Sequence, residues 1–316
     1  MPLKSQNLLD LSKIIDVELE LSTKCNANCP LCYRNYKSFK KHYEQPIRND
    51  ERELSEIISQ LEKFPNLEYV RLVGSVSEPT LHSNFLELCS YLKSQKLKLE
   101  ICTNGDTHKT EWWYELGKIL DDTDKIYFTI CGSNQKIHSH YRKNTSLQRI
   151  LENVSAFQNG NHPNKSDYAQ CIKFWYNNDD LESSEFKNIV SVFNNIYYTE
   201  TFLLKERDIY VKTDNIMDFR PPRKKADEYF KIDTISKTLW ENNLLHTANC
   251  MVDRYNRIQI DAYGKIYPCY LFLENSNGAE WDMDMSKIRR MDYYVCRFCD
   301  KKIKTICDDN DLDYII

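Results

Sequence analysis

Residues 24–33 read Lys-Cys-Asn-Ala-Asn-Cys-Pro-Leu-Cys-Tyr and place three cysteines, Cys25, Cys29 and Cys32, in the spacing C-x3-C-x2-C. This spacing supplies three thiolates, whereas the closed iron–sulfur clusters of simple electron carriers use four. A four-iron cluster held by three cysteines leaves one iron open to a substrate or cofactor. The stretch therefore predicts reactive metal chemistry rather than a scaffold.

The run resembles the signature of the radical S-adenosylmethionine (radical SAM) enzymes, and it follows a strand-like segment at 17–22, as it does in that family. The resemblance implies a 4Fe-4S cluster whose open iron binds S-adenosylmethionine. One electron, expected from a flavodoxin- or ferredoxin-type donor, then cleaves the cofactor to a 5'-deoxyadenosyl radical that abstracts a substrate hydrogen atom. The residue before the third cysteine is usually aromatic in the family and is Leu31 here. Tyr33, directly after that cysteine, is a candidate cofactor contact.

Composition indicates a protein large enough for one α/β domain with a smaller appendage, since the chain has 316 residues. A net charge of -4 argues against a nucleic-acid substrate. Because the sequence has neither a run of about 18 apolar residues nor a signal peptide at 1–10, we expect a cytoplasmic protein with no membrane partner. Twelve cysteines in a reducing compartment point to metal binding.

Strand-like and helix-like segments alternate through the first two thirds of the chain, which predicts parallel pairing with helical crossovers. The strand-like runs are 17–22, 68–73, 97–102, 124–131, 168–175 and about 197–203. The helix-like runs are near 51–63, 83–95, 110–120, 146–158 and 182–194. The fold class is therefore α/β, and resemblance to radical SAM domains implies a partial (β/α)6 TIM-like barrel. The expected divisions are a core domain at 1–204, a linker or lid at 205–245 and a small cysteine-rich domain at 246–316.

A second cysteine pattern lies near the carboxyl terminus, where Cys250 is followed by thirteen residues, Gly264, four residues and Cys269. This resembles the opening of the SPASM/Twitch auxiliary domains. Short strands at 257–261 and 265–267 predict a hairpin whose turn contains Gly264, because glycine tolerates turn geometry.

The resemblance implies a second, auxiliary 4Fe-4S cluster. Its four expected ligands are Cys250, Cys269, Cys296 and Cys299. Five cysteines in this region, rather than the seven of a full SPASM domain, favour the Twitch type with one auxiliary cluster. Cys307 is then a spare thiol or a replacement ligand. A zinc ribbon with four cysteine ligands is the structural alternative.

Further cofactor contacts are implied by resemblance at the ends of the predicted strands. The segment 74–82 resembles the family's Gly-Gly-Glu-Pro loop with one glycine lost, and Thr103-Asn104-Gly105 resembles its Thr-Asn-Gly run. A carboxylate suits the ammonium of S-adenosylmethionine, and short hydroxyl and amide groups suit its carboxylate or ribose. The candidate contacts besides Tyr33 are Gly74, Ser75, Glu78, Thr103, Asn104, Thr129, Ser133 and Arg142.

Cys131 and Cys171 lie at or near predicted barrel strands and are candidate hydrogen-atom donors, although buried thiols usually act as small hydrophobes. The predicted function is a radical SAM enzyme in which the auxiliary cluster aids oxidation, epimerisation or crosslinking of a small molecule or a partner-presented peptide. Two alternatives stay open. One is a non-catalytic protein in which both cysteine sets hold zinc, and the other is an RNA-modifying radical SAM enzyme.

Overall fold

The computed structural model describes residues 11–32, 34, 49–161, 166–200 and 256–267. The strands are β1 (Asp16–Leu19), β2 (Tyr69–Val73), β3 (Lys98–Thr103), β4 (Lys125–Thr129), β5 (Asp167–Lys173), β6 (Asn195–Glu200), β7 (Arg257–Ile260) and β8 (Ile266–Tyr267). The α-helices are α2 (Leu54–Leu61), α3 (Phe85–Ser94), α4 (Thr110–Ile119), α5 (Gln135–Tyr141), α6 (Leu147–Gly160), α7 (Asn178–Leu181) and α8 (Ser184–Val190). Short 3-10 helices are η1 (Leu11–Lys13) and η3 (Pro79–Leu81).

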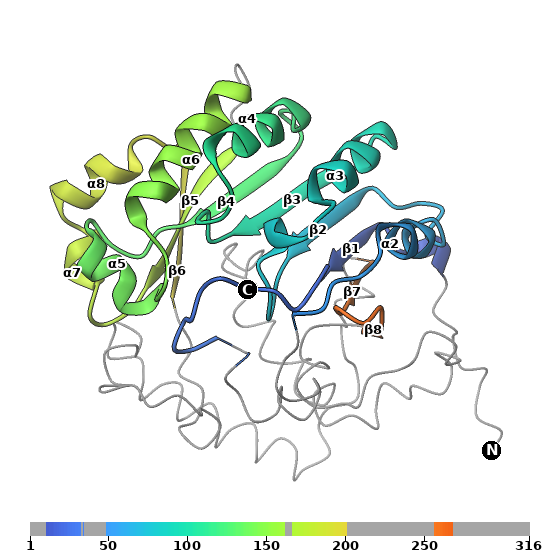
Figure 1. Ribbon diagram of the computed structural model, residues 1–316, viewed down its shortest axis with the longest axis horizontal. Helices are drawn as coiled ribbons and strands as arrows, with labels where there is room; N and C mark the ends of the chain where they lie inside the picture. The colour runs from blue at the N-terminus through green and yellow to red at the C-terminus, as the bar shows by residue number, and fades with distance from the viewer. Residues whose placement is uncertain (1–10, 33, 35–48, 162–165, 201–255, 268–316) are drawn as a thin grey trace, which may run out of the picture.

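These strands form one open sheet in the order β6-β5-β4-β3-β2-β1-β7-β8, in which only the β7–β8 pair is antiparallel. Helices α3, α4, α6 and α8 lie on one side of this sheet (Figure 1). The predicted partial (β/α)6 barrel is confirmed, because β1 to β6 are parallel and each predicted strand and helix lies within a few residues of an observed one.

The main core lies between the sheet and its helices, where alternate strand residues such as Val17, Leu19, Val70 and Leu72 are buried. Their neighbours in sequence face the barrel interior, because successive side chains of a strand point to opposite faces. Burying this apolar face supplies the main drive for the layered fold.

Glycines allow helices α4 and α6 to approach each other closely. A Cβ atom on Gly117 would lie 2.2 Å from the carbonyl oxygen of Phe157, and one on Gly160 would lie 2.2 Å from that of Tyr114. Larger residues at either position would push the helices apart. Ser146 caps the start of α6, since its side chain accepts a hydrogen bond from the main-chain nitrogen of Arg149.

The predicted hairpin is also confirmed, since β7 and β8 are antiparallel and joined by a turn in which Gly264 has a φ of +81°. Its first strand pairs in parallel with β1 and extends the barrel sheet, as Figure 1 shows. The expected boundaries at 204/205 and 245/246 lie outside the described residues. Among the helices that the structure describes, none is long and apolar enough to cross a membrane.

Candidate functional site

Predicted cofactor residues that follow different strands are brought to one edge of the sheet in the described part of the chain. The carboxyl ends of parallel strands share an edge, and α/β folds bind ligands there. The cysteine loop follows β1, the segment 74–78 follows β2, and Thr103-Asn104 lies at the end of β3. The described part of the site is therefore assembled from loops that are far apart in sequence.

The three signature cysteines lie together in this site. Cys29 is buried, and Cys25 and Cys32 are half-buried. Burial raises the pKa of Cys25 to about 11, with a contribution from the Glu78 carboxylate, and burial and the other two thiols raise that of Cys32 to about 12. The charged forms of the three thiols repel one another, and a bound metal cation would offset this repulsion and favour the deprotonated thiols. The donor set thus fits an iron–sulfur cluster.

The spacing of these thiols differs from that of a single-ion site. Within the described residues, no group of three or more His, Cys, Asp and Glu side chains is placed to hold one metal ion. In a four-iron cluster each cysteine binds a different iron, so its ligands are spread more widely than those around one ion. A cluster of this kind therefore does not require the three sulfurs to surround one point.

Hydrogen bonds from other loops fix the backbone of the cysteine loop. The main-chain nitrogen of Asn28 donates to the carbonyl of Lys143 at 2.9 Å, and the side chain of Asn26 donates to the carbonyl of Asp106 at 2.7 Å. Arg34 donates to the carbonyls of Thr23 and Val76, at 2.5 and 2.6 Å. The loop is therefore held from both sides of the site.

Glu78 joins the loops after β2 and β3. Its Oε1 accepts hydrogen bonds from the hydroxyls of Thr80 and Thr103 at 2.7 and 2.6 Å and from the main-chain nitrogen of Thr80 at 3.3 Å. Its Oε2 accepts from the main-chain nitrogen of Asn104 at 2.7 Å. Burial raises the pKa of this carboxyl, although these hydrogen bonds oppose the shift. A carboxylate has about four acceptor sites, so Oε2 keeps one that the described residues do not use.

Gly74 permits a tight turn before Glu78. A Cβ atom there would lie 2.1 Å from the carbonyl oxygen of Ser77, so any other residue would force the loop to move. Ser75 stands where the family motif has its second glycine, and its hydroxyl accepts a 3.3 Å hydrogen bond from Gln259. The side chain of Ser75 is therefore directed toward β7.

The candidates after β4 have different surroundings. The Thr129 hydroxyl lies 3.3 Å from both the carbonyl oxygen of Thr103 and the side-chain oxygen of Gln170, so it faces the barrel interior. Ser133 donates both its hydroxyl and its main-chain nitrogen to the carboxylate of Asp180. This contact gives Ser133 a structural explanation that the sequence did not suggest.

Arg142 and Cys131 lie beside the cysteine loop. The Arg142 Nη1 is 3.5 Å from the Cys29 sulfur. Cys29 and Cys131 share a small apolar cluster with Tyr141 and Phe174. Burial raises the pKa of Cys131 to about 11, while the neighbouring guanidinium lowers it. Cys131 therefore lies next to the three-cysteine loop, where its predicted role as a hydrogen-atom donor stays a prediction.

Cys171 is placed differently. It packs in the main core on the helix side of β5, beside residues such as Ala169. Its neighbours Gln170 and Ile172 face the interior instead. This position does not support a role as a hydrogen-atom donor.

Several predicted site residues lie outside the described residues. They are Tyr33, Cys250, Cys269, Cys296, Cys299 and Cys307. Their roles remain predictions.

A buried ion-pair network at the amino ends of the strands was not predicted. Arg71 donates to Asp16 at 3.0 Å and to Glu100 at 2.5 Å, and Arg257 donates to Asp16 at 2.9 Å. Burial raises the pKa of the neighbouring Glu18 to about 7, although both arginines lower it. The available signal was the alternation of acidic and apolar residues through 16–21, which gives β1 one polar face.

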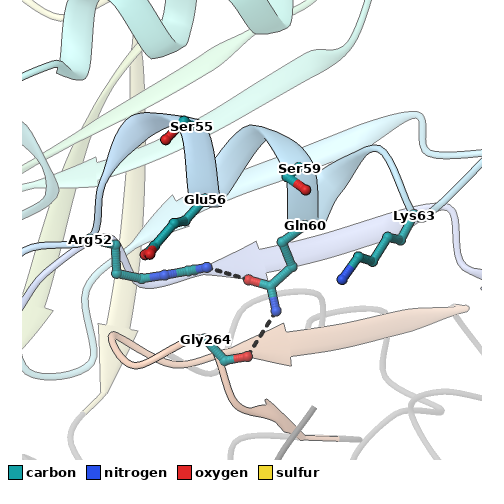
Figure 2. Close-up of a pocket in the computed structure, with 7 residues that line it drawn as sticks. All are labelled: Arg52, Ser55, Glu56, Ser59, Gln60, Lys63 and Gly264. Atoms are coloured by element: carbon teal, nitrogen blue, oxygen red, sulfur yellow. Dashed lines mark hydrogen bonds between the residues drawn. The ribbon is translucent and has the colours of Figure 1, made fainter. Parts of the chain in front are cut away.

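A pocket of about 390 Å³ lies between α2 and the β7–β8 hairpin. Figure 2 shows Arg52 donating to the Gln60 side chain, which donates in turn to the carbonyl of Gly264. These bonds connect the hairpin to α2. The pocket contains no predicted cofactor residue.

Comparison with known proteins agrees with the fold and the cysteine loop, which define a partial parallel barrel with a three-cysteine site at its carboxyl edge. Residues 19–169 match the Radical SAM superfamily. This part of the chain is a domain of the radical SAM superfamily, and that family implies S-adenosylmethionine and a 4Fe-4S cluster.

Two curated relatives match shorter stretches. The tungsten-containing aldehyde ferredoxin oxidoreductase cofactor-modifying protein of Pyrococcus furiosus is 31% identical over 113 residues, which cover 35% of this chain and 29% of that protein. The 7,8-dihydro-6-hydroxymethylpterin dimethyltransferase of Methanocaldococcus jannaschii is 25% identical over 147 residues, which cover 45% of this chain and 28% of that protein. The matches thus span less than a third of each relative.

Solved structures support the fold. Streptococcus suis SuiB bound to its precursor peptide SuiA matches with a TM-score of 0.56 and 13% identity, over 88% of this chain and 64% of that one. The enzyme anSMEcpe with bound AdoMet (S-adenosylmethionine) matches with a TM-score of 0.55 and 15% identity, over 90% of this chain and 88% of that one. At these identities the similarity shows a shared fold.

Proposed function

We propose that the protein is a radical SAM enzyme of the SPASM/Twitch type that removes a hydrogen atom from its substrate. The observation that carries this proposal is the packing of the three-cysteine loop against the loops after β2 and β3, at the ligand-binding edge of a radical SAM domain. When bound, the cluster and S-adenosylmethionine supply the 5'-deoxyadenosyl radical.

The chain's own residues have separate tasks in this proposal. Cys25, Cys29 and Cys32 hold the cluster. Glu78 fixes Thr103 and Asn104 in place, and its remaining acceptor position on Oε2 suits an ammonium group. Gly74 permits the tight turn over Ser77, and this turn would place the main chain of the loop beside the cofactor.

Weaker contacts complete the proposed cofactor site. Ser75 follows β2 and Thr129 ends β4, so each presents a hydroxyl at the carboxyl edge of the sheet, and Tyr33 is adjacent to the third cysteine in sequence. Ser133 is the least suited of the candidates because Asp180 already binds its polar groups.

The auxiliary cluster remains part of the proposal. The β7–β8 hairpin carries Gly264 of the C-x13-G-x4-C motif, which supports this part of the proposal. Cys250, Cys269, Cys296 and Cys299 would close this cluster, which would accept an electron from the substrate radical. An external flavodoxin- or ferredoxin-type protein would reduce the first cluster.

Two substrate classes are supported by different relatives. SuiB and anSMEcpe were solved with the peptides SuiA and Cp18Cys, which favours a peptide substrate. The two curated relatives are named for modification of a cofactor and of a pterin, which favours a small molecule. The peptide is the first candidate because its supporting structures cover most of this chain.

The decisive experiment measures 5'-deoxyadenosine after anaerobic reconstitution, reduction and addition of S-adenosylmethionine. The wild-type protein should form it, and the Cys25→Ala, Cys29→Ala and Cys32→Ala variants should not. Cys89→Ala is the matched control because Cys89 is a buried core thiol of α3. Nucleoside release by the three loop variants would refute the assignment, and a colourless zinc protein would favour the non-catalytic alternative.

A further inference from the structure

Arg142 connects helix α5 to the cysteine loop. It is the residue that caps the carboxyl end of α5, and its main-chain nitrogen donates to the carbonyl of His138 at 3.0 Å. Its Nη1 lies 3.5 Å from the sulfur of Cys29, and the guanidinium lies 5.5 Å from the centre of the Tyr141 ring. A fixed positive charge therefore faces one signature sulfur.

The segment that carries Arg142 is rigidly held. The carbonyl of Arg142 accepts a 2.6 Å hydrogen bond from the Thr145 hydroxyl. That hydroxyl lies 3.0 Å from Nε2 of the fully buried His138. The next carbonyl, of Lys143, accepts from the main-chain nitrogen of Asn28. Side chain and backbone thus both dock this segment onto the cysteine loop.

The surroundings strengthen the effect of this charge. The contact is partly buried beside the apolar cluster of Cys29, Cys131, Tyr141 and Phe174, and charge interactions are stronger where the local dielectric is low. The Nε of Arg142 is buried and has no hydrogen-bond partner in the described part of the chain. In the described part of the chain, the groups that act on this guanidinium are the thiols of Cys29 and Cys131 and the Tyr141 hydroxyl rather than a carboxylate.

We propose that Arg142 is a positioning residue that orients Cys29 and raises the reduction potential of the cluster held by the three signature cysteines. The inference rests on the proposed function. Hydrogen bonds to cysteine sulfurs set cluster potentials, and a nearby cation stabilises the reduced form, which carries one more negative charge. The added electron comes from the external donor, and no bond to Arg142 forms or breaks.

The test uses full-length protein reconstituted anaerobically, with the cluster potential followed by electron paramagnetic resonance in the absence of S-adenosylmethionine. The signal of interest is the one lost in the Cys25/Cys29/Cys32 triple alanine variant. Arg142→Gln should shift its potential to a more negative value, and Arg142→Lys, which keeps the charge but loses the planar fork, should shift it less. Lys136→Gln is the control because it removes an exposed charge from the same helix, α5.

Unchanged potentials in both Arg142 variants would overturn the proposal. So would an unchanged potential with weaker binding of S-adenosylmethionine, because Arg142 would then be a cofactor contact. If Arg142→Gln assembles no cluster, Arg142→Lys alone tests the proposal. A more negative potential in that variant supports it, and an unchanged potential overturns it. If the wild type shows no signal that depends on the three cysteines, the proposed function itself fails.

Discussion

The side-chain amide of Asn104 donates a 2.8 Å hydrogen bond to the side-chain oxygen of Asn26, which links the end of β3 to the interior of the cysteine loop. Asn26 also donates to the carbonyl of Asp106. One amide therefore makes two bonds that hold the loop between its first and second cysteines.

Asn26→Ala should release bound iron to a chelator several-fold faster than the wild type, because the loop loses both bonds. The free energy of unfolding should fall by only about 1–2 kcal/mol. Iron release is followed by absorbance. Asn66→Ala, which removes a 2.6 Å side-chain bond to the carbonyl of Ser12 far along the chain, should release iron at the wild-type rate. Equal rates for Asn26→Ala and wild type would show that the amide pair does not stabilise the loop.

Glu78→Gln should weaken S-adenosylmethionine binding by about tenfold or more, a loss of about 1.4 kcal/mol. The glutamine amide would direct donor hydrogens at Thr80, Thr103 or Asn104, where the carboxylate accepts. Binding to the oxidised protein is measured by calorimetry. Glu87→Gln, at the exposed start of α3, is the matched control. Wild-type affinity in Glu78→Gln would remove this carboxylate from the proposed site.

Asp16→Asn should destabilise the fold by about 3 kcal/mol, because removing one partner of a buried ion pair leaves charges uncompensated. Asp16 is 5% exposed and is bound by both Arg71 and Arg257. Urea unfolding monitored by circular dichroism gives the difference. Glu115→Gln breaks an exposed pair with Lys118 and should change stability by less than about 1 kcal/mol. A similarly small effect of Asp16→Asn would contradict the importance of the network.

Glu18 predicts a pH dependence of stability. Its pKa is raised from 4.5 to about 7, so between these values the folded protein keeps a proton that the unfolded chain releases. The contribution of Glu18 to the free energy of unfolding therefore falls as the pH rises from about 4.5 to 7.

Glu18→Gln removes this dependence, since a glutamine stays neutral. As the pH rises from 4 to 8, the free energy of unfolding of the variant should increase by up to about 3 kcal/mol relative to that of the wild type. The reason is that one pKa unit corresponds to about 1.4 kcal/mol. Urea unfolding at a series of pH values measures the difference. A difference that stays constant with pH would show that Glu18 titrates normally in the folded protein.

Local patterns predicted most of the barrel. The alternation through 16–21 marks β1, and the cysteine spacing at 25–32 is complete within eight residues. Parallel topology then explains why Glu78 and Asn104 meet, since both follow neighbouring strands. The short helices α5 and α7 were not predicted, because one or two turns carry little periodic signal.

Long-range contacts could not be predicted in the same way. The pairing of β7 with β1 joins residues that are about 240 positions apart, and no local feature of Arg257 or Gln259 indicates its partner. The contact of Ser133 with Asp180 and that of Arg142 with Cys29 likewise depend on the packed fold. The sequence indicated the chemical types at the site but not which of them bind one another.

The open coordination position on the proposed cluster can be measured directly. Electron–nuclear double resonance on the reduced protein, with S-adenosylmethionine labelled with 15N in its amino group and 17O in its carboxylate, reports whether these atoms bind iron. We expect hyperfine coupling to both labels in the wild type and none in the Cys25/Cys29/Cys32 triple alanine variant. A reduced cluster that depends on these cysteines but shows no coupling to either label would contradict the central claim.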